Sequence, residues 1–157
     1  MKIRPASRFD AQAISDLVLK AATTNKSDDF DESGWQHFQN LNQPAVMAER
    51  LEDPERFTLC FLDGDSIVGI ITIKNHQKLD QLFVAEHVRG RGIAKQLWNT
   101  AKQQCLQHGN PGNFWVRSSK MAIPIYERFG FIKQGERQAL NGIAYQLLSL
   151  GQPDNPN

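Results

Sequence analysis

Residues 82–95 read Leu82-Phe-Val-Ala-Glu-His-Val-Arg-Gly-Arg-Gly-Ile-Ala-Lys95, and this stretch decides the fold. It predicts a short apolar strand, a tight loop rich in glycine and arginine, and a helix that follows at once. Such a junction directs backbone N–H groups and the positive end of a helix dipole toward one point. Gly90 and Gly92 allow an anion to approach the backbone closely, because glycine accepts positive φ and carries no Cβ. The stretch therefore predicts a pyrophosphate site.

Other phosphate-binding motifs do not match this loop. A dinucleotide fingerprint, Gly-x-Gly-x-x-Gly, would need glycine where Lys95 stands. A P-loop would need four residues between its glycines and then Gly-Lys-Ser/Thr, which this loop lacks. The alternative is a glycine-rich turn before an ordinary helix, with solvated arginines.

Composition limits the classes of protein that fit. The chain has 157 residues and a formal net charge of +1, which favours one domain and argues against a dedicated nucleic-acid binder. We expect residues 1–150 to form that domain and residues 151–157 to be a frayed tail. No apolar run is long enough to span a membrane, so a cytoplasmic protein is expected. Cys60 and Cys105 lie in apolar patterns, which favours buried reduced thiols, and the scattered histidines indicate no metal site.

Hydrophobic periodicity gives the order of elements. The pattern predicts a strand, two helices, three strands, a helix, a strand, a helix and two strands. The first two helices are those from Ser7 onward and at 44–51, with a turn of helix at 35–38. The middle strands, 57–62, 67–73 and 78–84, are joined by short turns and should be antiparallel. The strand–helix–strand unit at 79–117 should be parallel and right-handed. Residues from Ser118 or Ser119 to Phe129 should form the last helix.

Two motifs resemble those of a known family. The spacing Arg89-x-x-Gly92-x-Ala94 is similar to the acyl-CoA signature Gln/Arg-x-x-Gly-x-Gly/Ala of the GNAT superfamily of N-acetyltransferases. The run Ala122-x-x-x-Tyr126-x-x-x-Gly130-Phe131 resembles the C-terminal motif of that family. The predicted order of elements is also the family's order. The resemblance covers the chain from its first strand to its closing hairpin, and it implies a mixed α/β sheet with the GNAT fold.

The resemblance also implies a binding site for acetyl-CoA, with no metal. In GNAT proteins the central strand splays from its parallel neighbour, and its backbone pairs with the pantetheine amides as an added strand would. By motif position, these backbone groups belong to Leu82, Phe83 and Val84. The pyrophosphate would bind the loop and the start of the helix, at Arg89, Gly90, Arg91, Gly92, Ile93, Ala94 and Lys95.

Tyr126 occupies the position of the family's catalytic tyrosine. A phenol near the sulfur can protonate the thiolate that leaves when an amine attacks a thioester. The alternative is a core tyrosine on an amphipathic helix. One departure from the family is Ser119, where many members carry asparagine. A serine can still cap the helix, but an amide contact with the cofactor would be lost.

The acceptor site is less sharply marked. In this family it should involve the segment between the first two helices, and here that segment is rich in carboxylates and contains Trp35. Carboxylates around aromatic rings would suit a cationic amine, although a solvated surface loop has the same composition. Asp80 should share a strand face with Leu82 and Val84. It could point into the cleft, and the alternative is an exposed carboxylate at the start of the strand. The candidate acceptor-binding residues are thus Asp28, Asp29, Asp31, Glu32, Trp35 and Asp80.

These residues together predict an acetyl-CoA-dependent N-acetyltransferase. The acetyl group would pass to a primary amine, on a small molecule or a peptide, by direct attack in a ternary complex. The chain shows no convincing nucleophilic Cys–His pair, which favours the direct route. One alternative is a non-catalytic acyl-CoA sensor with the same fold, and another is an anion-binding module for nucleic acid that uses Arg89, Arg91, Lys95 and Arg117. A monomer or homodimer is expected, with no nucleic-acid or membrane partner.

Overall fold

The computed structural model describes residues 1–24 and 28–153 of the chain. Residues 154–157 of the expected frayed tail lie outside the described residues. The strands are β1 (Lys2–Pro5), β2 (Arg56–Asp63), β3 (Ser66–Lys74), β4 (Lys78–Val84), β5 (Phe114–Ser118), β6 (Ile132–Leu140) and β7 (Ile143–Leu150). The helices are α1 (Ala11–Thr24), α2 (Glu32–Leu41), α3 (Pro44–Leu51), α4 (Ile93–Gln107) and α5 (Ile123–Arg128), with 3₁₀ turns η1 (Arg8–Asp10) and η2 (Glu86–Val88).

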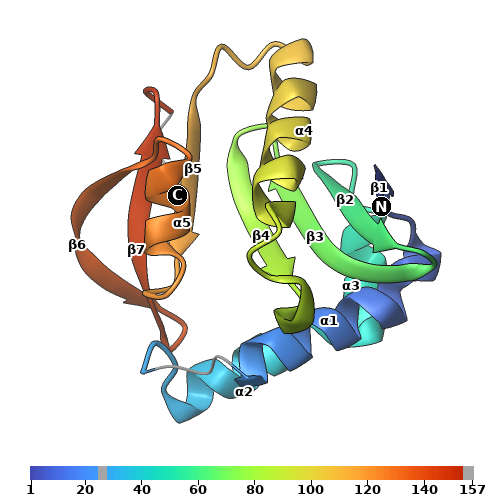
Figure 1. Cartoon of the computed structure of the whole chain (residues 1–157). Coiled ribbons are helices and arrows are strands. Elements are labelled where there is room, and N and C mark those ends of the chain that lie inside the picture. The colour runs from blue at the N-terminus through green and yellow to red at the C-terminus, as the bar shows by residue number, and fades with distance from the viewer. Residues whose placement is uncertain (25–27, 154–157) are drawn as a thin grey trace.

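All the named strands join one seven-stranded mixed sheet in the order β1-β2-β3-β4-β5-β7-β6. The pair β4–β5 is parallel and the other pairs are antiparallel, as the lengths of the connections predict. α4 and α5 pack on one face of the sheet, and α1, α2 and α3 pack on the other. Figure 1 shows β5, β7 and β6 on one side of the sheet and β1 to β4 on the other. The expected mixed α/β fold is confirmed.

The sheet opens between its two parallel strands. β4 and β5 pair only at Lys78–Trp115 and Leu79–Val116. On its other edge, β4 stays paired with β3 as far as Val84. Among the described residues, the end of β4 toward Val84 therefore has no strand partner on one edge. Unpaired backbone groups along such an edge can pair with an added strand or ligand.

A β-bulge at Asp80 corrects one prediction about β4. Thr72 of β3 pairs with Gln81, whereas Ile73 pairs with Leu79, so Asp80 is an extra residue in the ladder. Strict alternation would have placed Asp80 on the face of Leu82 and Val84. The bulge breaks that alternation, and the carboxylate instead reaches Arg50 of α3 on the opposite face.

Two helices differ from the prediction. α2 runs from Glu32 to Leu41, where only a turn at 35–38 was expected, so three α-helices precede β2. Asp31 begins this helix as its N-cap and accepts a hydrogen bond from the Gly34 amide at 2.7 Å. α5 begins at Ile123, later than predicted, with Pro124 in its first turn, where the missing N–H of proline costs nothing.

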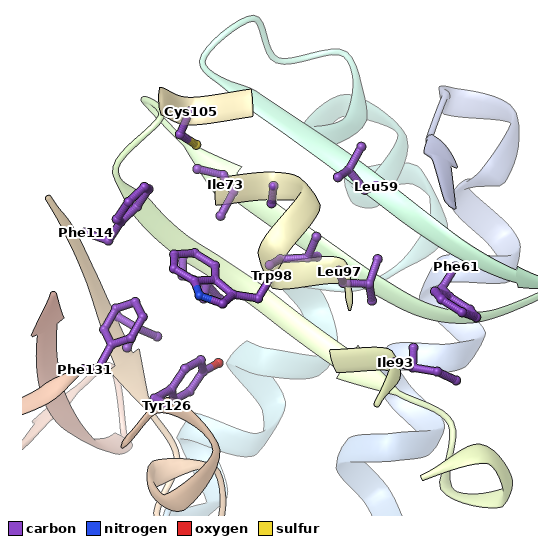
Figure 2. Packing of buried hydrophobic residues seen from close by; sticks show 14 of the residues in the cluster. Leu59, Phe61, Ile73, Ile93, Leu97, Trp98, Cys105, Phe114, Tyr126 and Phe131 are labelled. Carbon is purple, nitrogen blue, oxygen red and sulfur yellow. The ribbon is translucent and has the colours of Figure 1, made fainter. Parts of the chain in front are cut away.

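An aromatic cluster joins the two parts of the sheet under α4 and α5. Trp98 of α4 contacts Phe114 of β5 and Phe131 edge-on or tilted, at ring-centroid distances of 5.0 and 5.4 Å. The ring of Tyr126 lies 5.8 Å from that of Phe131 (Figure 2). Because β4 and β5 share so few hydrogen bonds, this packing does much to fix the position of α5 relative to α4.

Both cysteines are free and fully buried, as expected. Burial raises the pKa of each thiol, Cys60 and Cys105, to about 12. Within the described residues, no helix is both long and apolar enough to cross a membrane.

Candidate active site

The glycine loop between β4 and α4 has the conformation that an anion site requires. Gly90 and Gly92 have φ of +79° and +76°, in the left-handed region that favours glycine. A Cβ at either position would have no protein atom within 4 Å. The close approach that these glycines permit is therefore toward the outside of the protein, where a ligand would come.

The amides of this loop are available as donors. Gly92 is the N-cap of α4, and its carbonyl accepts the first hydrogen bond of the helix, from Gln96 at 3.0 Å. In the part of the chain that the structure describes, the amides of residues 90–95 donate no hydrogen bond to another protein group. Most of these residues are exposed, as are the side chains of Arg91 and Lys95. Free N–H groups, a helix dipole and two cations make this end of α4 suitable for a pyrophosphate.

Arg89 precedes these amides and has an additional structural contact. It is exposed, and its Nε donates a long hydrogen bond of 3.4 Å to the Val84 carbonyl. This contact ties the loop to the last residue of β4. The proposed anion site and the unpaired edge of β4 are consequently continuous along the chain.

Leu82, Phe83 and Val84 have the arrangement that the resemblance implies. Their backbones pair with Ile71, Ile70 and Gly69 of β3 on one edge and with no strand on the edge that faces β5. The side chains of Leu82 and Val84 pack against the core under α4, and Phe83 packs on the α1–α3 face. The side chains therefore pack in the core while one backbone edge of this strand stays open to a partner.

Tyr126 is a buried side chain whose hydroxyl group makes no hydrogen bond to any residue that the structure describes. Its exposed fraction is 5%, and its ring packs edge-on against Phe129 and Phe131. In the described residues, no fully buried side-chain oxygen or nitrogen lacks a partner, so the hydroxyl must retain access to space outside the core. Figure 2 shows the hydroxyl pointing away from Phe131, toward the side on which β4 and α4 lie. Burial raises the pKa of the phenol above its ordinary value, so it stays protonated.

The acidic segment before α2 is divided by the structure into buried and exposed carboxylates. Asp29 is 4% exposed, and its carboxylate pairs with Arg137 of β6 and accepts a hydrogen bond from the Lys120 amide at 3.0 Å. Its own carbonyl accepts from the Ala144 amide at 2.7 Å. Asp29 therefore joins three segments that are distant in sequence, and this gives it a structural role.

The same segment is anchored to the β6–β7 hairpin by its backbone. Phe30 forms an isolated bridge with Ile143, and the Asp31 amide donates to the Gly142 carbonyl at 3.0 Å. The Asp31 side chain caps α2, and the hydrogen bond from the Gly34 amide lowers the pKa of its carboxyl. Asp28 and Glu32 are exposed. Asp29 and Asp31 therefore serve the structure of this segment, whereas Asp28 and Glu32 have carboxylates exposed to solvent.

Replacing Asp29 with asparagine should lower the free energy of unfolding by about 1.5–3 kcal/mol, the range for hydrogen bonds to a charged group. Asp28→Asn is the matched control, because Asp28 lies next to it in the chain and is exposed. Urea denaturation of both variants would measure the difference. If both variants keep wild-type stability and raise the acceptor KM equally, the structural role of Asp29 is wrong and the acidic segment binds the acceptor as a unit.

Trp35 belongs to an aromatic cluster on the α1–α3 face. Its ring contacts Phe30 and Phe38 at centroid distances of 5.2 and 5.9 Å, and Phe38 reaches Phe83 of β4 at 6.4 Å. These four rings are each partly exposed. They connect the segment before α2 to β4, and their exposed parts form an apolar surface beside the opening between β4 and β5.

Asp80 is surrounded by cations. Its carboxylate lies 3.3 Å from Arg50, 3.3 Å from Arg56 and 3.1 Å from Lys78. Burial pushes the pKa of Asp80 upward, but Lys78, Arg50 and Arg56 outweigh that effect and hold the pKa below its ordinary value. An ionised carboxylate held by three cations is a poor ligand for a cationic amine and a poor general base.

Sequence reasoning did not find the partners of these carboxylates. Arg137 lies 108 positions from Asp29 along the chain, and Arg50 lies 30 positions from Asp80. No local pattern joins residues at such separations, because only the folded sheet brings them together.

The fold is that of solved GNAT acetyltransferases. The chain belongs to this family, since residues 26–150 match its acetyltransferase (GNAT) domain. Among curated proteins, it is 33% identical to the acetyltransferase Atu2258 of Agrobacterium fabrum over 76 residues. That match covers 46% of this chain and 56% of the relative, so it spans little more than half of the relative's length.

Solved structures share the fold over nearly the whole chain. A GCN5-related N-acetyltransferase from Rhodopseudomonas palustris superposes with a TM-score of 0.81 at 20% identity, covering 94% of this chain and 93% of the other. The PaiA N-acetyltransferase of Thermoplasma acidophilum, solved with coenzyme A, gives 0.79 at 12% identity, with coverage of 94% and 96%.

Proposed function

We propose that this protein transfers the acetyl group of acetyl-CoA to a primary amine. The observation that carries the proposal is the continuity of three features: the free amides at 90–95, the unpaired edge of β4, and the Tyr126 hydroxyl on the α5 side of the opening. The crystal structures of relatives that contain coenzyme A support it, as do the acetyltransferase names of relatives.

The residues of the chain divide the work of binding. The amides and cations from Arg89 to Lys95 would hold the pyrophosphate: Arg89, Gly90, Arg91, Gly92, Ile93, Ala94 and Lys95. The backbone of Leu82, Phe83 and Val84 would pair with the pantetheine amides as a neighbouring strand does. The two glycines fit this assignment, because each leaves open the space that a Cβ would fill.

The chemical step would form a bond between the amine nitrogen and the acetyl carbon and break the carbon–sulfur bond. The amine gives up a proton to solvent water, and the Tyr126 phenol donates one to the departing thiolate and regains a proton from solvent. Direct attack is favoured over an acyl-enzyme route, because both cysteines are buried with raised pKa values and are weak nucleophiles.

Calorimetry with acetyl-CoA and a thiol-release assay with a panel of amines would test this function. We expect micromolar-range binding, about 8 kcal/mol, and release of coenzyme A with at least one amine class. Binding without turnover by any amine would favour a non-catalytic acyl-CoA sensor. An absence of acetyl-CoA binding would overturn the proposal altogether.

A further inference from the structure

A cationic side chain on β5 lies where β4 and β5 separate. Arg117 directly follows Val116, which is the last β5 residue paired with β4. Val116 packs into the core under α4 and α5. Since side chains alternate along a strand, Arg117 projects to the opposite face, on which α1, α2 and α3 pack. It is therefore on the face of the opening opposite to Tyr126.

Two aromatic rings hold the Arg117 guanidinium group. Its central carbon lies 4.9 Å from the ring centroid of Trp115 and 5.4 Å from that of Tyr145 on β7. Cation–π contacts fix the position of a guanidinium without using its N–H groups, which lie in the plane of the group. The rings thus hold the cation in place and leave its donors for another partner.

No carboxylate among the described residues supplies that partner. Across residues 1–24 and 28–153, no carboxylate oxygen lies within 4.0 Å of Arg117, and its guanidinium donates no hydrogen bond. Each of the other partly buried arginines in these residues pairs with an aspartate: Arg4 with Asp10, Arg50 with Asp80, and Arg56 with Asp53 and Asp80. Arg117 is the exception in this group.

The surroundings of Arg117 favour an anion over a cation. Lys78 lies on the same face, with its Nζ 5.3 Å from the Trp115 ring centroid. Arg50, Arg56 and Lys78 converge on Asp80, and Arg56 also pairs with Asp53, so cations already engage both carboxylates. The nearby buried Asp29 is engaged by Arg137. The groups lining this side of the opening therefore carry a surplus of positive charge.

We propose that Arg117 binds a carboxylate group of the acceptor, so that the acceptor is an amine that also carries a carboxylate, such as an amino acid. The inference rests on the proposed acetyl transfer and names its substrate class. A guanidinium presents two parallel N–H donors that match the two oxygens of a carboxylate, and this geometry gives both affinity and orientation. The partly exposed rings of Trp35, Phe38 and Phe83 would offer apolar contact to the rest of the molecule.

Matched acceptor pairs would test the inference. Each pair is a free L-amino acid and its C-terminal amide, which has the same side chain and amine but no carboxylate. The ratio of kcat/KM for the acid to that for the amide is measured in the wild type, in Arg117→Gln and in Arg117→Lys. Comparing ratios between variants cancels the different intrinsic reactivities of the two amines. Arg8→Gln is the matched control, because Arg8 is an exposed arginine in η1.

We expect Arg117→Gln to lower the acid-to-amide ratio by about 10- to 100-fold, through a higher KM for the acid, with an unchanged KM for acetyl-CoA. The acid-to-amide ratio of Arg117→Lys should lie between those of the wild type and Arg117→Gln, since lysine keeps the charge and loses the planar pair of donors. Arg117→Lys also provides the test if the glutamine variant does not fold. Arg8→Gln should leave the ratio unchanged.

Two other outcomes would be informative in different ways. A ratio that is the same in the wild type and in both Arg117 variants, with turnover intact, would overturn the carboxylate assignment while the acetyl transfer stands. A chain that neither binds acetyl-CoA nor releases coenzyme A with any pair fails at the proposed function itself, and that result overturns both.

Discussion

Replacing Tyr126 with phenylalanine is expected to lower kcat by about 10²–10⁴-fold, the range for general acid catalysis. The change deletes the hydroxyl and keeps the ring, so the contacts with Phe129 and Phe131 should survive. Because the hydroxyl makes no hydrogen bond to residues 1–24 or 28–153, the core loses no polar partner there. Folding and acetyl-CoA affinity should therefore remain close to those of the wild type. The loss corresponds to about 3–5 kcal/mol of activation free energy.

The measurement separates catalysis from packing. Steady-state kinetics should show the loss in kcat with little change in the KM for acetyl-CoA, since the proton matters most as the thiolate forms. Tyr145→Phe is not a suitable control, because Tyr145 contacts Arg117, which we place in the acceptor site. Phe131→Leu is better, since it perturbs the packing around Tyr126 and leaves the phenol in place. A Tyr126→Phe variant within a few-fold of the wild type, with chemistry limiting the rate, would identify Tyr126 as a packing residue.

The raised pKa of Tyr126 also predicts how the activity responds to alkaline pH. Burial raises the pKa of the phenol above its ordinary value, so the acid form persists in the folded state at pH values where a free tyrosine ionises. The activity should thus show no alkaline loss from this group below about pH 10, the ordinary value. A group with a raised folded pKa contributes its full stability below the unfolded pKa and loses it as the pH rises further. A decline in kcat centred near pH 9 that disappears in Tyr126→Phe would contradict the raised pKa.

Local patterns predicted the features that depend on neighbours in the chain. The strand–loop–helix junction at 82–95 could be predicted from its own residues, because Gly90 and Gly92 mark the loop and both adopt positive φ. The short turns between β2, β3 and β4 forced antiparallel pairing, and the long crossover through α4 allowed a parallel pair. These inferences needed no knowledge of distant contacts.

The errors came from interactions that no local pattern reveals. Asp80 was placed on the wrong face, because a bulge is a property of two paired strands and the sequence of one strand does not show it. The carboxylate cluster at 28–32 suggested a cation site until Asp29 was found paired with Arg137 and Asp31 capping α2. Charge composition alone does not distinguish a free carboxylate from one used in folding.

The availability of Arg117 for a ligand also depends on contacts that a local sequence pattern does not show. In the sequence it was one of several basic residues that an anion-binding module could use. Its environment depends on Trp115 from its own strand and Tyr145 from β7, and on the absence of an acid within reach among the described residues. Partners across a sheet decide whether an arginine is solvated, paired or available for a ligand.

Replacing Gly92 with valine is expected to abolish measurable acetyl-CoA binding. Gly92 has φ of +76° at the N-cap of α4, a conformation that a β-branched residue avoids. If the backbone keeps this conformation, the new side chain occupies the space that the ligand would need, since no protein atom lies within 4 Å of its Cβ. If φ becomes negative, the free amides around it no longer point toward one position. Either response should weaken an affinity in the micromolar range by more than about 100-fold, which is 2.7 kcal/mol or more.

Gly109→Val is the matched control for this variant. Gly109 follows the other end of the same helix with φ of +94°, and a Cβ there also meets no protein atom within 4 Å. The control therefore carries a similar backbone strain and lies away from the loop, so it should lose stability and keep its affinity for acetyl-CoA. Calorimetric titration of both folded variants gives the comparison. Equal affinities in the two variants would show that strain alone explains the effect, and wild-type affinity in Gly92→Val would remove this loop from the binding site.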